Sequence, residues 1–264
     1  MKKIAFLGPN ATFTHEASLK YFGENNEFIP INRISEIYNK IMSDEVDFGV
    51  VPSENSIGGS ISDTLDLFIK THLKVYDEVI LQIKQNLLSK LTDKSQIKKI
   101  FSHPQSLMQC SGYISANFKG VECIETSSNA KASILAKDEP DSAAIGPKLC
   151  AKEYDLNIIE EGINDSKKNE TKFYIISKTY GNKKNKSLII FSVPNKSGSL
   201  FNILKVFKKY KINMTKIESR PSKTKNWEYV FIVEYENSKE QKNNEVFIKK
   251  LKGECDYFDY LGHY

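Results

Sequence analysis

The first 180 residues alternate between short apolar runs and segments with helical periodicity, and this alternation limits the possible folds more than any other feature. Residues 3–7 and 48–51 are apolar runs that stop at proline-containing turns. Residues 34–42 instead place their apolar side chains on one helical face. A second series of such strands and helices covers residues 74–160. Strands that alternate with helices predict an α/β domain built on parallel sheets.

The order of these segments predicts two lobes and then a smaller second domain. The chain is expected to leave the first lobe near residue 75 and to return near residue 158, which would enclose a cleft between the lobes. We therefore expect a first domain at residues 1–178, with lobe 1 at about 1–75 and 158–178 and lobe 2 at about 76–157. A polar linker at residues 179–187 follows.

Residues 187–264 have the pattern of a ferredoxin-like domain. A strand and an amphipathic helix come first, then two strands at residues 212–220 and 227–235, and then a second helix at residues 243–251. The aromatic-rich last ten residues leave room for a final strand, and the alternative is a tail at an interface. This βαββαβ order predicts one four-stranded sheet with two helices.

The composition argues against several classes of function. The 38 basic residues exceed the 33 acidic ones and give a net charge of +5, but only Arg33 and Arg220 are arginines. A surface that grips nucleic acid phosphates usually uses more arginine, so we expect no nucleic acid partner. No apolar segment is long enough to span a membrane. The four cysteines lack metal-ligand or disulfide spacing, so we expect no metal and a reducing cytoplasmic location.

Polar clusters follow several predicted strands, at residues 8–14, 53–60, 102–105 and 127–129. Each cluster alone could simply cap a helix, because Ser, Thr and Asn are the preferred caps. Together they are expected to line the cleft with hydroxyls, amides and one histidine, and with backbone N–H groups suited to an anion. They lack the glycine spacing of nucleotide-binding loops.

In their order and spacing these clusters resemble the motifs of the prephenate dehydratase family. The matching segments are GPNATFT at residues 8–14, PSENS at 52–56, SHPQSLMQC at 102–110 and TKF at 171–173. Three positions depart from the family pattern: Ala11 replaces a glycine, Asn129 a threonine, and Lys172 the arginine of Thr-Arg-Phe. Lysine keeps the positive charge but not the two-pronged geometry of arginine.

The resemblance implies a monofunctional lyase that converts prephenate to phenylpyruvate, with loss of carbon dioxide and water, on the route to L-phenylalanine. It implies a two-lobed, periplasmic-binding-protein-like catalytic domain and no cofactor or metal. Thr171 matches the threonine to which catalysis is assigned, and its hydroxyl would donate a hydrogen bond to the departing hydroxyl. The expected substrate contacts are Thr12, Phe13, Asn55, Ser56, Ser102, His103, Gln105, Ser128, Lys172 and Phe173.

The resemblance also implies that the second domain is an ACT domain that binds L-phenylalanine between two copies of the chain. The expected effector contacts are Asn195, Gly198, Ser199, Leu200, Glu218, Ser219, Arg220 and Pro221. A homodimer or homotetramer with feedback regulation would follow. The sequence leaves two alternatives open: an arogenate dehydratase, which acts on the amino analogue, and a regulator whose two-lobed cleft only binds an amino acid or another solute. We expect no chorismate mutase activity, because no helical segment precedes the first strand.

Overall fold

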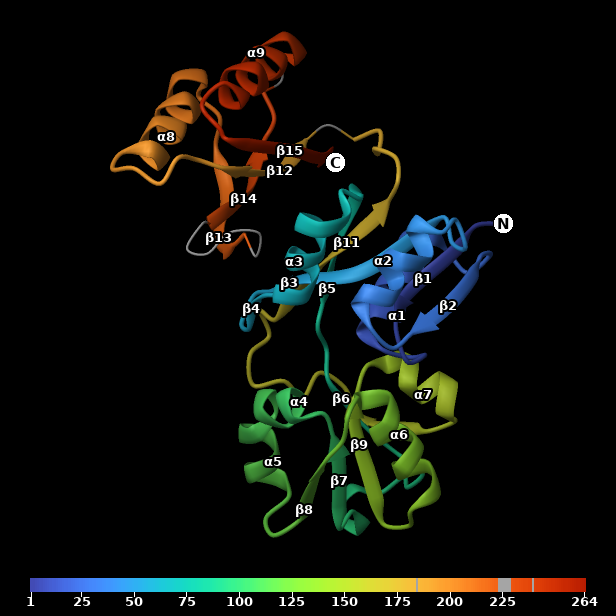
Figure 1. The fold of residues 1–264 in the computed structure, drawn as a ribbon. Coiled ribbons are helices and arrows are strands. Elements are labelled where there is room, and N and C mark those ends of the chain that lie inside the picture. Colours follow the sequence, from blue (N-terminus) through green and yellow to red (C-terminus); the bar gives the residue numbers. More distant parts are fainter. Residues whose placement is uncertain (184, 223–228, 239) are drawn as a thin grey trace.

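A computed structural model describes residues 1–183, 185–222, 229–238 and 240–264. The described chain forms three sheets, one for each lobe and one for the C-terminal domain. Figure 1 shows the first lobe between the second lobe and the C-terminal domain. The described residues thus form the two α/β lobes and the βαββαβ C-terminal domain that we expect from the sequence.

The first lobe is built around a sheet with the strand order β2-β1-β3-β11-β5, and β4 pairs with β3 at one end. Its strands are β1 (Lys3–Leu7), β2 (Glu27–Ile31), β3 (Phe48–Asn55), β4 (Gly59–Ser60), β5 (Lys74–Gln82) and β11 (Glu170–Ser177). Its helices are α1 (Phe13–Phe22), α2 (Ile34–Met42) and α3 (Ser62–Thr71). Apolar residues of α1 pack on one face of the sheet, and those of α2 and α3 pack on the other.

The second lobe has the strand order β10-β6-β9-β7-β8. Its strands are β6 (Asn86–Ser89), β7 (Lys99–Ser102), β8 (Glu122–Glu125), β9 (Ser142–Gly146) and β10 (Asn157–Glu160). Its helices are the 3₁₀ turn η1 (Lys94–Gln96), α4 (Pro104–Gln109), α5 (Ser111–Asn117), α6 (Asn129–Asp138) and α7 (Lys148–Tyr154). Two helices, α4 and α5, connect β7 to β8, because the backbone leaves the helical conformation at Cys110 and α5 starts afresh.

The crossings between the lobes lie later in the chain than expected. β5 pairs with β11 in the first lobe as far as Gln82, so the chain leaves that lobe after residue 82 and not near residue 75. β10 pairs with β6 in the second lobe, so the return follows Glu160. The expectation of parallel sheets holds for β1, β2 and β3, but β11 runs antiparallel to both of its neighbours. An extended segment shows its burial pattern in the sequence but not which sheet or direction it takes.

The C-terminal domain has the strand order β13-β14-β12-β15 and two helices. Its elements are β12 (Lys186–Ser192), α8 (Ser199–Tyr210), β13 (Met214–Pro221), β14 (Tyr229–Glu236), α9 (Gln241–Lys252) and β15 (Tyr257–His263). The third strand was expected from residue 227, but residues 227 and 228 lie outside the described part of the chain. The expected final strand is β15.

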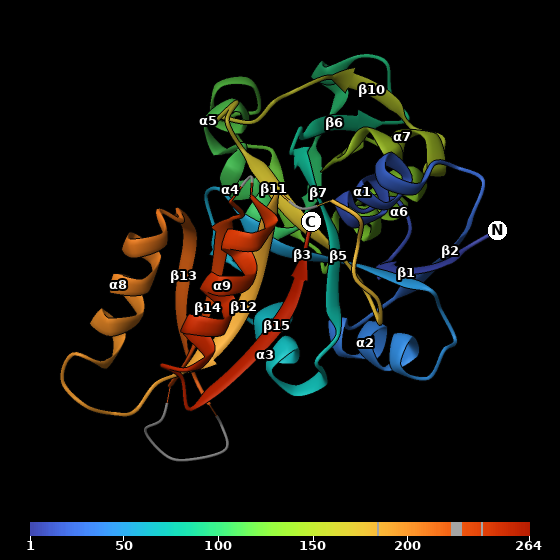
Figure 2. The same ribbon diagram turned by 90° about the horizontal axis from the view of Figure 1, so that it is seen from above.

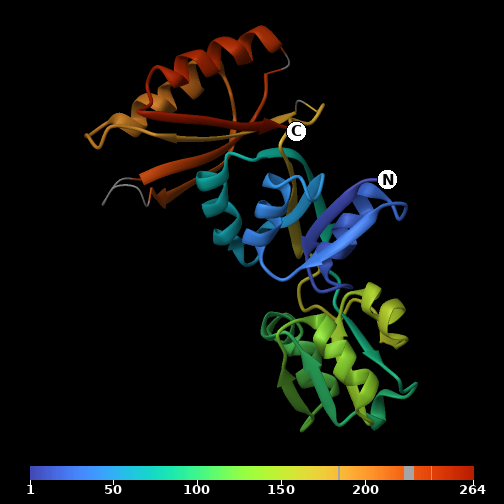
Figure 3. The same ribbon diagram turned by 45° about the vertical axis from the view of Figure 1, so that its right-hand side comes forward.

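The C-terminal domain packs directly on the first lobe. One face of its sheet, with Phe191 and Val233, is covered by α8 and α9. The other face, with Ile190 and Ile232, joins the apolar core formed by α2, α3 and the first-lobe sheet. Figures 2 and 3 show α8 and α9 on the side of this sheet that faces away from the first lobe. The two domains therefore share a core, and a displacement of one strains the other.

Candidate active site

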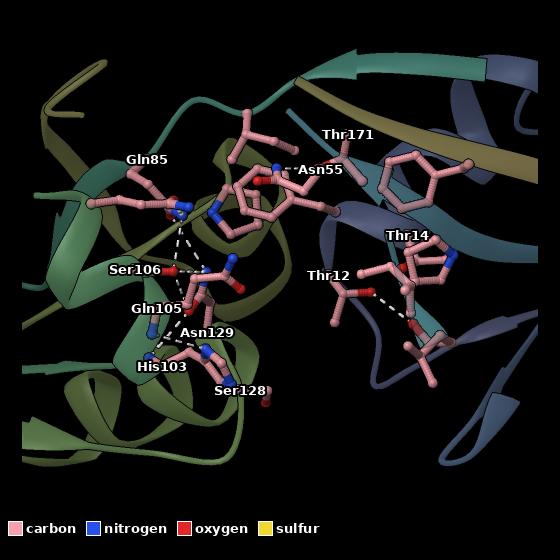
Figure 4. Close-up of a pocket in the computed structure, with 18 of the residues that line it drawn as sticks. Thr12, Thr14, Asn55, Gln85, His103, Gln105, Ser106, Ser128, Asn129 and Thr171 are labelled. Atoms are coloured by element: carbon pink, nitrogen blue, oxygen red, sulfur yellow. Dashed lines mark hydrogen bonds between the residues drawn. The ribbon is translucent and has the colours of Figure 1, made fainter. Parts of the chain in front are cut away.

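A pocket of about 280 Å³ lies where the two lobes meet. Thr12, Phe13, Asn55, Thr171 and Phe173 line it from the first lobe, as Figure 4 shows for the labelled members of this group. The second lobe contributes, among others, Gln85, His103, Gln105, Ser106, Ser128 and Asn129. No Lys, Arg, Asp or Glu is among the described residues that line the pocket. Its polar groups are thus hydroxyls, amides and one imidazole.

Asn55 and Thr171 form the polar centre of the first-lobe wall. They face each other across β3 and β11, and both are more than 90% buried. The Asn55 side-chain N–H donates to Thr171 Oγ1 at 2.9 Å, and also to the side-chain oxygen of Asn169 at 2.8 Å. The Asn55 Oδ1 atom accepts from the backbone N–H groups of residues 57 and 58. Because Thr171 Oγ1 already accepts from an amide, its own O–H remains to donate toward the pocket.

Gln85, Ser106 and Asn129 form a hydrogen-bonded wall on the opposite lobe (Figure 4). The Gln85 Nε2 atom donates to Ser106 Oγ at 2.9 Å, and Asn129 Nδ2 donates to the same oxygen at 3.0 Å. Asn129 Oδ1 accepts from the His103 backbone N–H at 3.2 Å. Such a connected network fixes the wall before any ligand arrives.

Three helices begin at the pocket. Thr12 caps α1 and Ser128 caps α6, in each case by accepting a backbone N–H with the side-chain oxygen. His103 caps α4 in the same way through Nδ1. Helix N-termini present unpaired N–H groups and a partial positive charge, so they suit carboxylates in a pocket without a cationic side chain.

A half-buried histidine, His15, holds the backbone of the 8–14 segment in place. The Ala11 backbone N–H donates to His15 Nδ1 at 3.1 Å, and the His15 ring stacks on Phe6 with centroids 4.5 Å apart. Burial lowers the pKa of His15 below its usual 6.5, against a weaker opposing effect of Glu153, so the ring is neutral and can accept this bond. Ala11 has φ 61°, a left-handed conformation that favours glycine, so this departure from the family pattern carries backbone strain.

Seven of the ten expected substrate contacts, together with Thr171, lie on the pocket lining, and three do not. Ser56 binds backbone groups of residues 168 and 170, and Ser102 is fully buried with its hydroxyl on the Ile145 carbonyl. Lys172 points to the C-terminal domain, where its ammonium lies 3.1 Å from Glu234. These three side chains bind other parts of the protein and do not face the pocket.

Thr14 lines the pocket and belongs to the 8–14 cluster that was expected to face the cleft, but other lining residues were not anticipated from the sequence. Ser106 and Gln109 lie within a recognised motif, and that position was the available signal. Gln85 stands alone between a lysine and an asparagine at the first crossing, and nothing local distinguishes it. Its role depends on where the chain crosses between the lobes.

A second pocket of about 620 Å³ lies between the C-terminal domain and α3. Its lining includes Asn195, Ser199 and Leu200, which belong to the expected effector site. Gly198 precedes α8 with φ 83°, a left-handed conformation that favours glycine. The expected contacts Glu218, Ser219, Arg220 and Pro221 do not line this pocket. Arg220 instead binds Asp66 of α3 at 2.8 Å.

Among the described residues, no group of His, Cys, Asp and Glu is arranged to hold a metal ion. None of the described helices combines the length and the apolar character needed to cross a lipid bilayer.

Known proteins similar to this chain match it over nearly its whole length. Residues 4–180 match the prephenate dehydratase family and residues 187–243 match the ACT domain. A bifunctional chorismate mutase/prephenate dehydratase of Aquifex aeolicus is 38% identical, over 99% of this chain and 73% of the relative. The prephenate dehydratase of Methanocaldococcus jannaschii is 35% identical, over 100% of this chain and 98% of the relative. The crystal structure of an Arthrobacter aurescens prephenate dehydratase in complex with L-Phe has a TM-score of 0.88 and 26% identity, over 98% of this chain and 88% of that one.

Proposed function

Because the chain belongs to the prephenate dehydratase family, we propose that the pocket around Thr171 is where it removes carbon dioxide and water from prephenate. The chain is a prephenate dehydratase with an ACT regulatory domain. The roles of its individual residues, its regulation and its assembly are our proposals. The observation that carries the assignment of Thr171 is the hydrogen bond that its oxygen accepts from Asn55.

The reaction needs a hydrogen-bond donor at the departing hydroxyl. As the bond from the ring to its carboxylate breaks, its electron pair shifts through the ring and displaces the hydroxyl on the opposite carbon. The ring becomes aromatic as that carbon–oxygen bond breaks, and the departing oxygen takes one proton and leaves as water. We assign to the Thr171 O–H the donation to that oxygen, since Asn55 orients the hydroxyl outward. A threonine hydroxyl is a weak acid, so the proton that it gives must be restored from water or another group.

The neutral pocket favours the loss of carbon dioxide. A carboxylate without a cationic partner in a partly dry site has a less stabilised charge, and decarboxylation removes that charge. The N–H groups at the starts of α1 and α6 would hold the substrate's carboxylates without neutralising them fully. We therefore expect the pocket to bind the dianion by hydrogen bonds and not by ion pairs.

The same lining favours prephenate over arogenate. The amino group of arogenate is a cation, and a buried cation needs a carboxylate or several oxygen acceptors. No Asp or Glu is among the described lining residues. We expect kcat/KM for prephenate to exceed that for arogenate, and parallel assays of phenylpyruvate and phenylalanine formation test this preference.

For the regulatory domain, we propose that L-phenylalanine binds in the pocket beside α8 and lowers turnover. Asn195, Ser199 and Leu200 would contact it, and a second copy of the chain would complete the site. Phe201 and Leu204, which lie one turn apart on α8, are both exposed and support a homo-oligomer, because neighbouring large apolar side chains at a surface mark interfaces. Solution mass with and without L-phenylalanine tests the assembly, and a rise in Tm tests the binding.

Replacing Thr171 by alanine tests the catalytic proposal as a whole. We expect turnover of prephenate to collapse while binding of prephenate persists, because the amides and helix starts remain. A variant that keeps wild-type turnover would remove Thr171 from the mechanism. A wild-type protein that binds prephenate but never converts it would instead support the binding-regulator alternative.

A further inference from the structure

The strands that carry the catalytic pair have opposite faces, and the second face meets the ACT domain. Thr171 and Asn55 are cross-strand neighbours on β11 and β3, and both point into the pocket (Figure 4). The next pair in the same register is Lys172 and Glu54. Both of these side chains make ion pairs with the ACT domain, at Glu234 and Lys216 respectively.

The ion pair between Lys172 and Glu234 is buried, and both carboxylate oxygens of Glu234 have hydrogen-bond partners. The Lys172 ammonium lies 3.1 and 3.2 Å from the two carboxylate oxygens of Glu234, whose side chain is 1% exposed. The same carboxylate accepts from the hydroxyls of Thr215 at 2.7 Å and Tyr264 at 2.9 Å. Burial alone would raise the pKa of Glu234, but the charge of Lys172 and the bond from Thr215 hold that pKa below its usual value. Glu234 is therefore ionised and fixed in place.

The contact to Glu234 lies beside an irregularity in the strand pairing of β11. The register between β11 and β3 shifts between Lys172 and Phe173, one residue beyond Thr171. On its other side β11 pairs with β5 in unbroken register from Glu170 to Ile175, so the ladder to β5 and the side-chain contacts of Lys172 together hold the backbone where the pairing with β3 is irregular. Lys172 also lies 4.0 Å from Glu54 and 3.8 Å from Glu78 of the first lobe, but Glu234, at 3.1 Å, is the nearest and most buried of these three partners.

The opposite strand has a matching contact of reversed polarity. Glu54 precedes Asn55 on β3 and accepts from the Lys216 ammonium of β13 at 3.1 Å. The ACT domain thus presents an acid to the strand of Thr171 and a base to the strand of Asn55. A shift of the ACT-domain sheet would therefore displace the strands that carry Thr171 and Asn55.

We propose that Glu234 is a positioning residue for the dehydratase reaction: by holding Lys172 it sets the backbone at Thr171, so the active site is complete only when the ACT domain is seated on β11 and β3. This rests on the proposed role of Thr171. It gives a direct path from the regulatory domain to the reacting group, because Lys172 is the residue next to Thr171. It also explains why position 172 keeps a positive charge without lining the pocket.

The test compares Glu234→Gln with the matched control Glu236→Gln in the full-length protein. Glu236 lies two residues further on β14, is exposed and accepts a hydrogen bond from Asn213, and it makes no side-chain hydrogen bond or ion pair with the described residues of the first lobe. We expect Glu234→Gln to lower kcat for prephenate on the order of 10- to 100-fold, with KM within about threefold, because misplacement of a reacting group costs rate more than binding. Glu236→Gln should keep wild-type kcat.

A double variant separates positioning from general destabilisation. Lys172→Gln should reproduce the loss of kcat, and Lys172→Gln/Glu234→Gln should lose no more than either single variant, since both act through one contact. L-phenylalanine should still raise the Tm of Glu234→Gln but should no longer change its turnover.

Three results would overturn the proposal. They are a folded Glu234→Gln protein with wild-type kcat, a loss confined to KM, and single-variant losses that multiply in the double variant. If Glu234→Gln fails to fold, Lys172→Gln decides alone, and wild-type kcat in that variant is refuting. Failure of the proposed function is distinguishable, because it would appear as unchanged turnover in Thr171→Ala or as no turnover in the wild type.

Discussion

Replacing Thr171 by valine removes one hydroxyl and almost no volume, so its effects on stability and on rate can be computed separately. The Asn55 N–H groups lose Thr171 Oγ1 but keep Asn169 Oδ1 at 2.8 Å and the Glu170 carbonyl at 3.1 Å. No buried donor is orphaned, so the free energy of unfolding should fall by only about 1 kcal/mol. For a protein of this size that lowers Tm by about 2–4 °C.

The effect of the same substitution on rate should be far larger. Loss of a positioned proton or hydrogen-bond donor costs about 10²–10⁴-fold in kcat, which is about 3–5 kcal/mol of transition-state stabilisation. Thr171→Ser keeps the hydroxyl and loses one methyl group, so it should cost about 1 kcal/mol of stability and less than about tenfold in kcat.

Steady-state phenylpyruvate formation and thermal unfolding of both variants provide the comparison. The reasoning is refuted if Thr171→Val keeps kcat within about threefold of wild type, which is below the range for a lost donor. It is also refuted if Thr171→Ser and Thr171→Val lose activity equally at similar Tm, because the methyl group and not the hydroxyl would then matter.

Three further predictions concern stability and regulation. Lys172→Arg should raise the free energy of unfolding by about 1 kcal/mol. Glu78 Oε2 is buried without a hydrogen bond, 3.8 Å from the Lys172 ammonium, and the longer guanidinium of arginine can reach it. An unchanged or lower Tm would contradict this. Because the pKa of His15 is lowered in the folded state, its contribution to stability is full above pH 6.5 and is lost as pH falls through the folded-state pKa. The difference in Tm between wild type and His15→Gln should therefore shrink on acidification. A constant difference would show that His15 does not titrate in this range. The lowered pKa of Glu234 likewise contributes stability that is lost on acidification, but at lower pH. The difference in Tm between wild type and Glu234→Gln should stay constant above about pH 4.5 and disappear below it. A difference that disappears near neutral pH would rule this out.

The local elements of the fold were predictable because each leaves a pattern in the sequence. β1 ends at Gly8-Pro9, α2 has a clear apolar face, and the βαββαβ order of the C-terminal domain follows from periodicity alone. What could not be predicted is which sheet an extended segment joins. β5 and β10 extend across the expected lobe boundaries, because strand partners are chosen by residues far away in the chain.

The candidate site divides in the same way. Thr171 and Asn55 were identified through motifs, and their contact is a register match between two strands. Lys172 was expected on the substrate side, but the side-chain alternation of β11 puts it on the ACT side. Gln85 was missed, because its position in the pocket is set by the crossing between the lobes. A motif identifies residues that belong together but not the direction in which each side chain points.

The most direct test of the central claim is to mix the purified full-length protein with prephenate and to measure phenylpyruvate and carbon dioxide together, for wild type and Thr171→Val. We predict equal amounts of the two products from the wild type, and a loss of rate in the variant without loss of prephenate binding. Phenylpyruvate formation at the wild-type rate by Thr171→Val, or prephenate binding without any product by the wild type, would contradict the assignment of this pocket as the catalytic site.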